Sequence, residues 1–191
     1  MRLKTILLGA LVCASASVSW AGLLGAQVTG TLNFGANPLN YFNSTNAFVP
    51  GGCQNSGLGS ATVTIVNPTT EFCFADGANI DSANFTDTTL AISDQVLGGA
   101  GAANWVMTFT FAPGLVTGVT ENTDNFPNAG GVTAGFASNV LTLTWAGTGT
   151  PGTFNATYTL TSGVPEPSSA LLLGGGLLAM ATLVRKRRVK A

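Results

Sequence analysis

The sequence predicts an all-β domain, an antiparallel β-sandwich of jelly-roll or immunoglobulin-like type. Three observations support this prediction. Apolar residues alternate with Thr or Asn over short runs, which is the period of a half-buried strand. Turn-forming pairs such as Asn67-Pro68 and Pro113-Gly114 separate these runs. No stretch of residues 22–162 combines helical spacing with helix caps, so the strands must cover one another's apolar faces.

An N-terminal signal peptide precedes the domain. Met1-Arg2-Leu3-Lys4 is basic, residues 5–13 are apolar, and small residues follow at Ala14-Ser15-Ala16 and Ser19-Trp20-Ala21. This order is typical of a secretory signal, and we expect cleavage after Ala21. Residues 1–21 are therefore set apart from the domain, which we expect to span residues 22–162.

The alternation places the strands along this domain. The strongest run puts Trp105, Met107, Phe109 and Phe111 on one face and predicts a central strand. Two shorter runs predict strands at 71–74 and 115–120, and we expect the Asn-, Gly- and Ser-rich segment 35–59 to be a long loop. About eight to ten such strands would pack as two antiparallel sheets. The remaining predicted strands are residues 28–34, 62–65, 89–93, 141–145 and 154–161.

Two cysteines, Cys53 and Cys73, remain once the signal peptide is removed. In an oxidising compartment the simplest interpretation is a disulfide that closes a loop of about 20 residues and stabilises the domain by around 3 kcal/mol. A pair of free thiols is the alternative. A metal site is disfavoured because the chain has no histidine and no second cysteine pair. We therefore expect neither a metal nor a cofactor.

Charge is divided sharply along the chain. Of the eight Asp and Glu residues only Glu166 lies outside residues 22–162, so that segment holds seven carboxylates and no Lys, Arg or His. No salt bridge between side chains can form inside such a domain. A surface without Lys or Arg cannot neutralise phosphates, which argues against nucleic acid as a partner. All seven basic residues lie in the terminal segments: Arg2, Lys4, Arg185, Lys186, Arg187, Arg188 and Lys190.

The seven carboxylates are the only candidate acid–base groups of the domain. A glycoside hydrolase would need two of them, but acidic residues scattered over predicted turns are more typical of solvated loops, so we expect no catalytic residue. The stretches 76–81 and 121–125 loosely resemble calcium loops, and Asx turns explain both without a metal. The carboxylates are Glu71, Asp76, Asp81, Asp87, Asp94, Glu121 and Asp124.

Two further patterns raise the question of a binding surface. Trp105, Trp145, Tyr41 and Tyr158 could form a sugar-stacking platform, but three of them lie on predicted core faces, so only Tyr41 is expected in a loop. Thr-x-Thr pairs on several predicted strands raise an ice-binding alternative. The β-propensity of Thr alone would also select it for solvent-facing positions, and the pairs follow no fixed repeat.

The C-terminal segment, residues 163–191, has three parts. Val164-Pro165-Glu166-Pro167 comes first, an uncharged apolar stretch covers residues 170–184, and Arg185-Lys186-Arg187-Arg188 follows. The apolar stretch covers about 22 Å as a helix, so a transmembrane helix needs its flanking residues to span the roughly 30 Å hydrocarbon core. Lys and Arg clusters stay on the cytoplasmic side, which predicts that the domain lies on the far side.

This three-part pattern resembles the PEP-CTERM sorting signal of Gram-negative bacteria, over about residues 163–190. The resemblance implies that Val164, Pro165, Glu166 and Pro167 are read by exosortase, a membrane-embedded cysteine transpeptidase that cuts near the motif. An ordinary single-pass anchor is the alternative.

The same resemblance implies where the protein goes and what it does. It implies a non-enzymatic protein, held briefly at the inner membrane with its domain in the periplasm and then sorted to the cell surface or beyond, beside exopolysaccharide in a biofilm. The alternative is a carbohydrate-binding or carbohydrate-cleaving domain.

Overall fold

The structure of the chain is a computed structural model, which describes residues 22–35, 40–43, 62–98, 104–128, 130–147 and 149–163. The described residues belong to one compact unit, Gly22–Val164. No helix within the described residues is long and apolar enough to cross a membrane. Several predicted features lie outside the described residues: the cleavage site at Ala21, Cys53, Val164, Pro165, Glu166, Pro167, Arg185, Lys186, Arg187 and Arg188.

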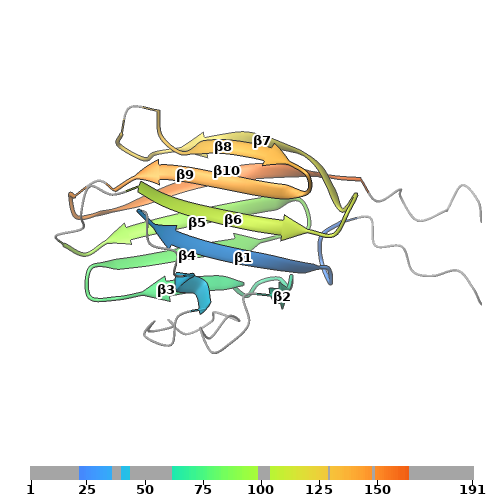
Figure 1. Ribbon diagram of the computed structural model, residues 1–191, viewed down its shortest axis with the longest axis horizontal. Helices are drawn as coiled ribbons and strands as arrows, with labels where there is room; N and C mark the ends of the chain where they lie inside the picture. Colours follow the sequence, from blue (N-terminus) through green and yellow to red (C-terminus); the bar gives the residue numbers. More distant parts are fainter. Residues whose placement is uncertain are drawn as a thin grey trace, which may run out of the picture. The chain divides into compact units, whose positions relative to one another are not determined.

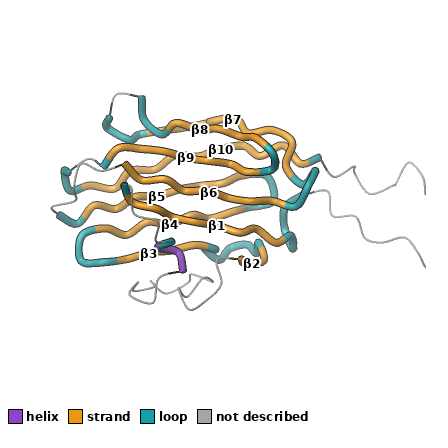
Figure 2. Tube along the Cα trace, in the orientation of Figure 1, coloured by secondary structure: helices purple, strands orange, loops and turns teal. Residues whose placement is uncertain are grey.

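In the part of the chain that the structure describes, ten strands form two antiparallel five-stranded sheets, which confirms the all-β prediction (Figures 1 and 2). The first sheet has the order β2-β1-β6-β9-β8 and the second β3-β4-β5-β10-β7. The strands of the first sheet are β1 (Gln27–Phe34), β2 (Thr62–Thr64), β6 (Asn104–Phe111), β8 (Thr133–Ala137) and β9 (Val140–Ala146). Those of the second are β3 (Phe72–Ala75), β4 (Asn79–Phe85), β5 (Thr89–Val96), β7 (Val116–Asp124) and β10 (Gly152–Ser162).

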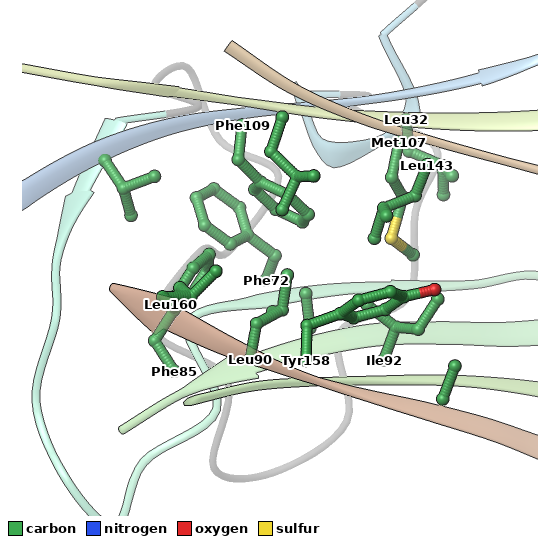
Figure 3. Close-up of a cluster of buried hydrophobic side chains, with 14 of the residues drawn as sticks. Leu32, Phe72, Phe85, Leu90, Ile92, Met107, Phe109, Leu143, Tyr158 and Leu160 are labelled. Atoms are coloured by element: carbon green, nitrogen blue, oxygen red, sulfur yellow. The ribbon is translucent and has the colours of Figure 1, made fainter. Parts of the chain in front are cut away.

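The apolar faces of the two sheets meet in one core. Strand β6 is the middle strand of its sheet, and its predicted inward residues Trp105, Met107, Phe109 and Phe111 are at most 3% exposed. Burial of such a face is the main favourable contribution to folding. Figure 3 shows side chains from both sheets converging between the layers: Leu32, Met107, Phe109 and Leu143 from the first, and Phe72, Phe85, Leu90, Ile92, Tyr158 and Leu160 from the second.

Gly30 permits the closest approach between the layers. It occupies a buried, inward position of β1, and a Cβ atom added there would lie 2.5 Å from a ring carbon of Phe72 in β3. Real Cβ atoms do not approach a ring carbon so closely. The absence of a side chain at residue 30 therefore gives the Phe72 ring its place in the core.

Three parts of the fold differ from the prediction. Strands β4 and β8 were not expected. In β4 the polar residues Asn79 and Asp81 face inward with Ala83 and Phe85, which hides the usual alternation. Strand β8 is short and mostly exposed, and Phe136 is its one large apolar residue.

The predicted loop 35–59 is also different where the structure describes it. It contains a short 3-10 helix, η1 (Tyr41–Asn43), and Phe42 within it is fully buried. The Asn40 Oδ1 atom accepts hydrogen bonds from the Leu32 and Phe42 amides, at 3.0 and 3.1 Å. This amide side chain joins η1 to β1, so that part of the loop belongs to the core.

Candidate functional site

The charges of the domain are segregated by sheet. None of the five strands of the first sheet contains Asp, Glu, Lys or Arg. The seven carboxylates lie on strands of the second sheet, directly before β3, or in the turns that join β3 to β4 and β4 to β5. The outer surface of the first sheet is therefore formed by strands without a charged residue.

Threonines line this uncharged surface in register across the strands. The Thr29 and Thr62 hydroxyls are hydrogen-bonded at 2.7 Å, and those of Thr31 and Thr108 are also hydrogen-bonded. Paired hydroxyls hold each other's orientation, so the surface carries ordered, neutral hydroxyl groups. We call it the threonine face, formed by the outward residues Thr29, Thr31, Thr62, Thr64, Thr108, Thr110, Thr133, Thr142 and Thr144.

The proposed aromatic platform is not formed by the four residues considered for it. Trp105, Trp145 and Tyr158 are at most 3% exposed. Tyr41 is half-buried, with its ring centroid 4.9 Å from that of Phe74 and 6.0 Å from that of Trp105. These rings belong to the core, as their alternation predicts, and Tyr41 joins them.

The two calcium-like stretches are closed by backbone hydrogen bonds. The Asp76 Oδ1 atom accepts from the Ala78 and Asn79 amides, both at 2.7 Å, which is an Asx turn. The Asp124 carboxylate accepts from the amides of Phe126 at 2.8 Å and Val132 at 2.6 Å. Among the residues that the structure describes, no group of three or more His, Cys, Asp or Glu side chains is placed to hold a metal ion.

Three carboxylates lie in the core, although the sequence predicted that the acidic residues of the domain are solvated. Glu71, Asp81 and Asp94 are all 0% exposed. Glu71 accepts hydrogen bonds from the Val66 amide at 3.0 Å and the Phe85 amide at 2.7 Å. Burial raises the pKa of the Glu71 carboxyl, and these backbone hydrogen bonds partly oppose that effect. Glu71 therefore braces the segment before β3 against the end of β4.

Asp81 and Asp94 form a buried pair. They are directly opposite each other on β4 and β5, and the Trp145 indole of the first sheet donates a 3.0 Å hydrogen bond to Asp94 Oδ2. Burial, followed by the charges of Asp94 and Asp76, raises the pKa of Asp81 well above its ordinary value. Burial also raises the pKa of Asp94, and the indole hydrogen bond opposes this.

Several oxygen atoms around this pair have no hydrogen-bond partner. They are both carboxylate oxygens of Asp81, Oδ1 of Asp94 and Oδ1 of Asn79. Asn79 is 5% exposed and lies two residues before Asp81 on the same inward side of β4. We call these three residues the acid pocket. The inverted alternation of β4, with polar residues inward, is the sequence signal that could have identified it.

Cys73 lies in β3, is 2% exposed and is disulfide-bonded. Because Cys53 lies outside the described residues, its pairing with Cys73 stays a prediction.

No family model, curated protein or solved structure matches this chain. Any functional conclusion therefore depends on the residues themselves.

Proposed function

We propose that the chain is an exported, non-enzymatic protein of the cell envelope or extracellular matrix, associated with exopolysaccharide. The signal peptide in residues 1–21 and the membrane segment in residues 163–191 support this route. Exosortase would act as a transient partner at Val164, Pro165, Glu166 and Pro167, after which the domain reaches the cell surface or the exterior. A jelly-roll or immunoglobulin-like topology for the sandwich is part of the same proposal.

The threonine face is the observation that supports association with polysaccharide. Contact with a neutral, hydroxyl-rich polymer removes water from the protein surface, which is costly for a charged group. The strands of the threonine face have no charged residue, so its hydroxyls can exchange water for sugar hydroxyls at little cost. The carboxylates that reach solvent, Asp76, Asp87, Glu121 and Asp124, lie on the second sheet or its turns, and they keep that side hydrated and the protein soluble.

A matched pair of lysine substitutions tests this proposal. Thr29 pairs with Thr62 at 2.7 Å on the threonine face, and Thr123 pairs with Thr157 at 2.7 Å on the second sheet. In a pelleting assay with exopolysaccharide purified from producing cells, we expect Thr29→Lys to lose most of the bound fraction and Thr123→Lys to retain it. Equal binding by the two variants, or no binding by the wild type, would contradict the role of this face.

The sorting step has its own test. Mass spectrometry of the protein recovered from its native host should show a C-terminus close to Val164–Pro167. If the recovered protein still contained residues Arg185 to Ala191, cleavage would be excluded and only membrane anchoring would remain.

The threonine rows on neighbouring strands also favour ice binding as a second candidate, since an ordered hydroxyl array is its basis. Thermal hysteresis in the wild type that is lost in Thr29→Lys would select ice binding over polysaccharide. Glycan-array binding unaffected by Thr29→Lys would instead place a sugar site elsewhere on the domain.

A further inference from the structure

Asp81 and Asp94 are buried carboxylates whose negative charge no other side chain of the domain can balance. Both are 0% exposed and face each other across two paired strands. Isolated carboxylates in an apolar interior are strongly disfavoured, and a pair of them is worse. Because residues 22–163 contain no Lys, Arg or His, no side chain of the domain can supply the compensating charge. A proton or a cation must therefore do so.

The unpartnered atoms of the acid pocket indicate which of these it is. Residues directly opposite in antiparallel strands have Cβ atoms about 4.5–5.5 Å apart, and diagonal neighbours about 7–8 Å. Asp81 and Asp94 are direct neighbours and Asn79 is diagonal to Asp94. Three neighbouring side chains thus carry four buried acceptor oxygens that lack a hydrogen-bond partner. One shared proton joins two oxygens, whereas a hard cation binds several at once.

We propose that Asp81, Asp94 and Asn79 bind one hard divalent cation of the Ca²⁺ class inside the sandwich. Two carboxylates balance its double charge, and the amide oxygen of Asn79 adds a neutral ligand. An all-oxygen set favours Ca²⁺ over Zn²⁺ or copper, and Ca²⁺ accepts irregular geometry where Mg²⁺ requires an octahedron and retains its waters. The pocket has two carboxylates and one amide, so it is not a group of three His, Cys, Asp or Glu side chains.

The Trp145 hydrogen bond fits a positioning role. By donating to Asp94 Oδ2 at 3.0 Å, the indole leaves Oδ1 as the unpartnered atom of that carboxylate. Hydrogen bonds of this kind orient metal-ligating groups, and their loss commonly weakens metal binding by about 10–100-fold. Trp145 belongs to the opposite sheet, so a cation bound here would link both layers.

Terbium luminescence tests the site directly, because Tb³⁺ replaces Ca²⁺ at oxygen sites and is excited by a nearby indole. The full chain, purified in mild detergent and freed of metals with a chelator, should show Tb³⁺ emission on tryptophan excitation. Added Ca²⁺ should displace that emission. Ca²⁺ should also raise the melting temperature in proportion to the logarithm of its concentration, because it binds only the folded state.

Substitutions connect the signal to these residues. Asp81→Asn and Asp94→Asn should each weaken Ca²⁺ binding by more than about tenfold, since each removes a charged ligand. Asp87→Asn, at an exposed position in the turn between β4 and β5, is the matched control and should bind as the wild type does. Asn79→Ala keeps both carboxylates and should still weaken binding, which serves if the aspartate variants fail to fold.

Two results would overturn the proposal. The first is a wild-type melting temperature that neither chelation nor millimolar Ca²⁺ changes, which would mean that protons and not a cation compensate the charge of the pair. The second is a Ca²⁺ response that persists unchanged in Asp81→Asn, Asp94→Asn and Asn79→Ala, which would place the ion at another site.

Discussion

Replacing Glu71 with alanine should destabilise the domain more than any other single carboxylate truncation outside the acid pocket. The Glu71 carboxylate is buried and accepts hydrogen bonds from the Val66 and Phe85 amides. Removing it leaves the buried Phe85 amide and the partly buried Val66 amide without an acceptor.

The size of the effect follows from those two amides. A buried donor left without a partner costs about 1–3 kcal/mol, and the partly buried Val66 amide should cost less than the buried Phe85 amide, so the loss of both acceptors should cost about 2–4 kcal/mol. Glu71→Gln keeps one acceptor oxygen and turns an NH₂ group towards the other amide, so we expect about 1–3 kcal/mol. Domains of this kind have a free energy of unfolding of about 5–15 kcal/mol, so the alanine variant should lose a large fraction of it.

Urea unfolding followed by tryptophan fluorescence would measure the loss, with the midpoint and slope fitted separately. Glu121→Ala is the control, because Glu121 is exposed on β7 and such surface changes usually stay within about 0.5 kcal/mol. If Glu71→Ala and Glu121→Ala had the same free energy of unfolding, the bracing role of Glu71 would be wrong.

The pH dependence of stability gives a second measure of the buried acids. Burial raises the pKa of Glu71, Asp81 and Asp94 in the folded state. The ordinary pKa is 3.8 for Asp and 4.5 for Glu, so at a pH above these values the folded protein holds more protons on these groups than the unfolded chain does. Stability from these groups is therefore fully present below those values and is lost as pH rises through the folded pKa values. In chelator, the urea midpoint should fall from acid to neutral pH. A midpoint that rises over that range would contradict this sign.

Three further predictions concern packing, a turn and the disulfide. Gly30→Ala should cost about 1–3 kcal/mol in urea unfolding, because its Cβ meets the Phe72 ring, whereas Gly135→Ala, with no atom within 4 Å of the added carbon, should change little. Ser138→Gly should raise the free energy of unfolding by up to about 1 kcal/mol, because Ser138 has a φ of 51° in the turn between β8 and β9; a lower melting temperature would contradict this. Thiol titration of the denatured, unreduced mature chain should detect no free Cys73, and two reactive thiols would exclude its predicted pairing.

The strands that sequence reasoning found are those whose apolar residues all face one way. Strand β6 is the clearest case, since Trp105, Met107 and Phe109 alternate with smaller or polar residues and all are buried. Alternation reports the contrast between two faces, so a strand with such contrast is visible without knowledge of its neighbours.

Strand β4 shows why the acid pocket could not be predicted in the same way. Its inward side begins with Asn79 and Asp81, and its outward side includes Ile80, so the polarity of its first half is reversed. Without knowledge of the neighbouring strands, this stretch of sequence predicts a polar turn. Only the pairing of Asp81 with Asp94, and of β4 with two neighbours, places those groups in the core. The register between strands depends on the whole sheet, so the sequence of one segment does not determine it.

The unequal distribution of carboxylates gives each molecule two sides that respond differently to salt. Between neighbouring copies at a crowded surface, the acidic sides repel one another over a distance set by the Debye length, about 10 Å at 0.1 M salt. The sides formed by the first sheet have no charge on their strands and experience no such repulsion. Changing the ionic strength should therefore alter the repulsion between the acidic sides while leaving any contact between the neutral sides almost constant.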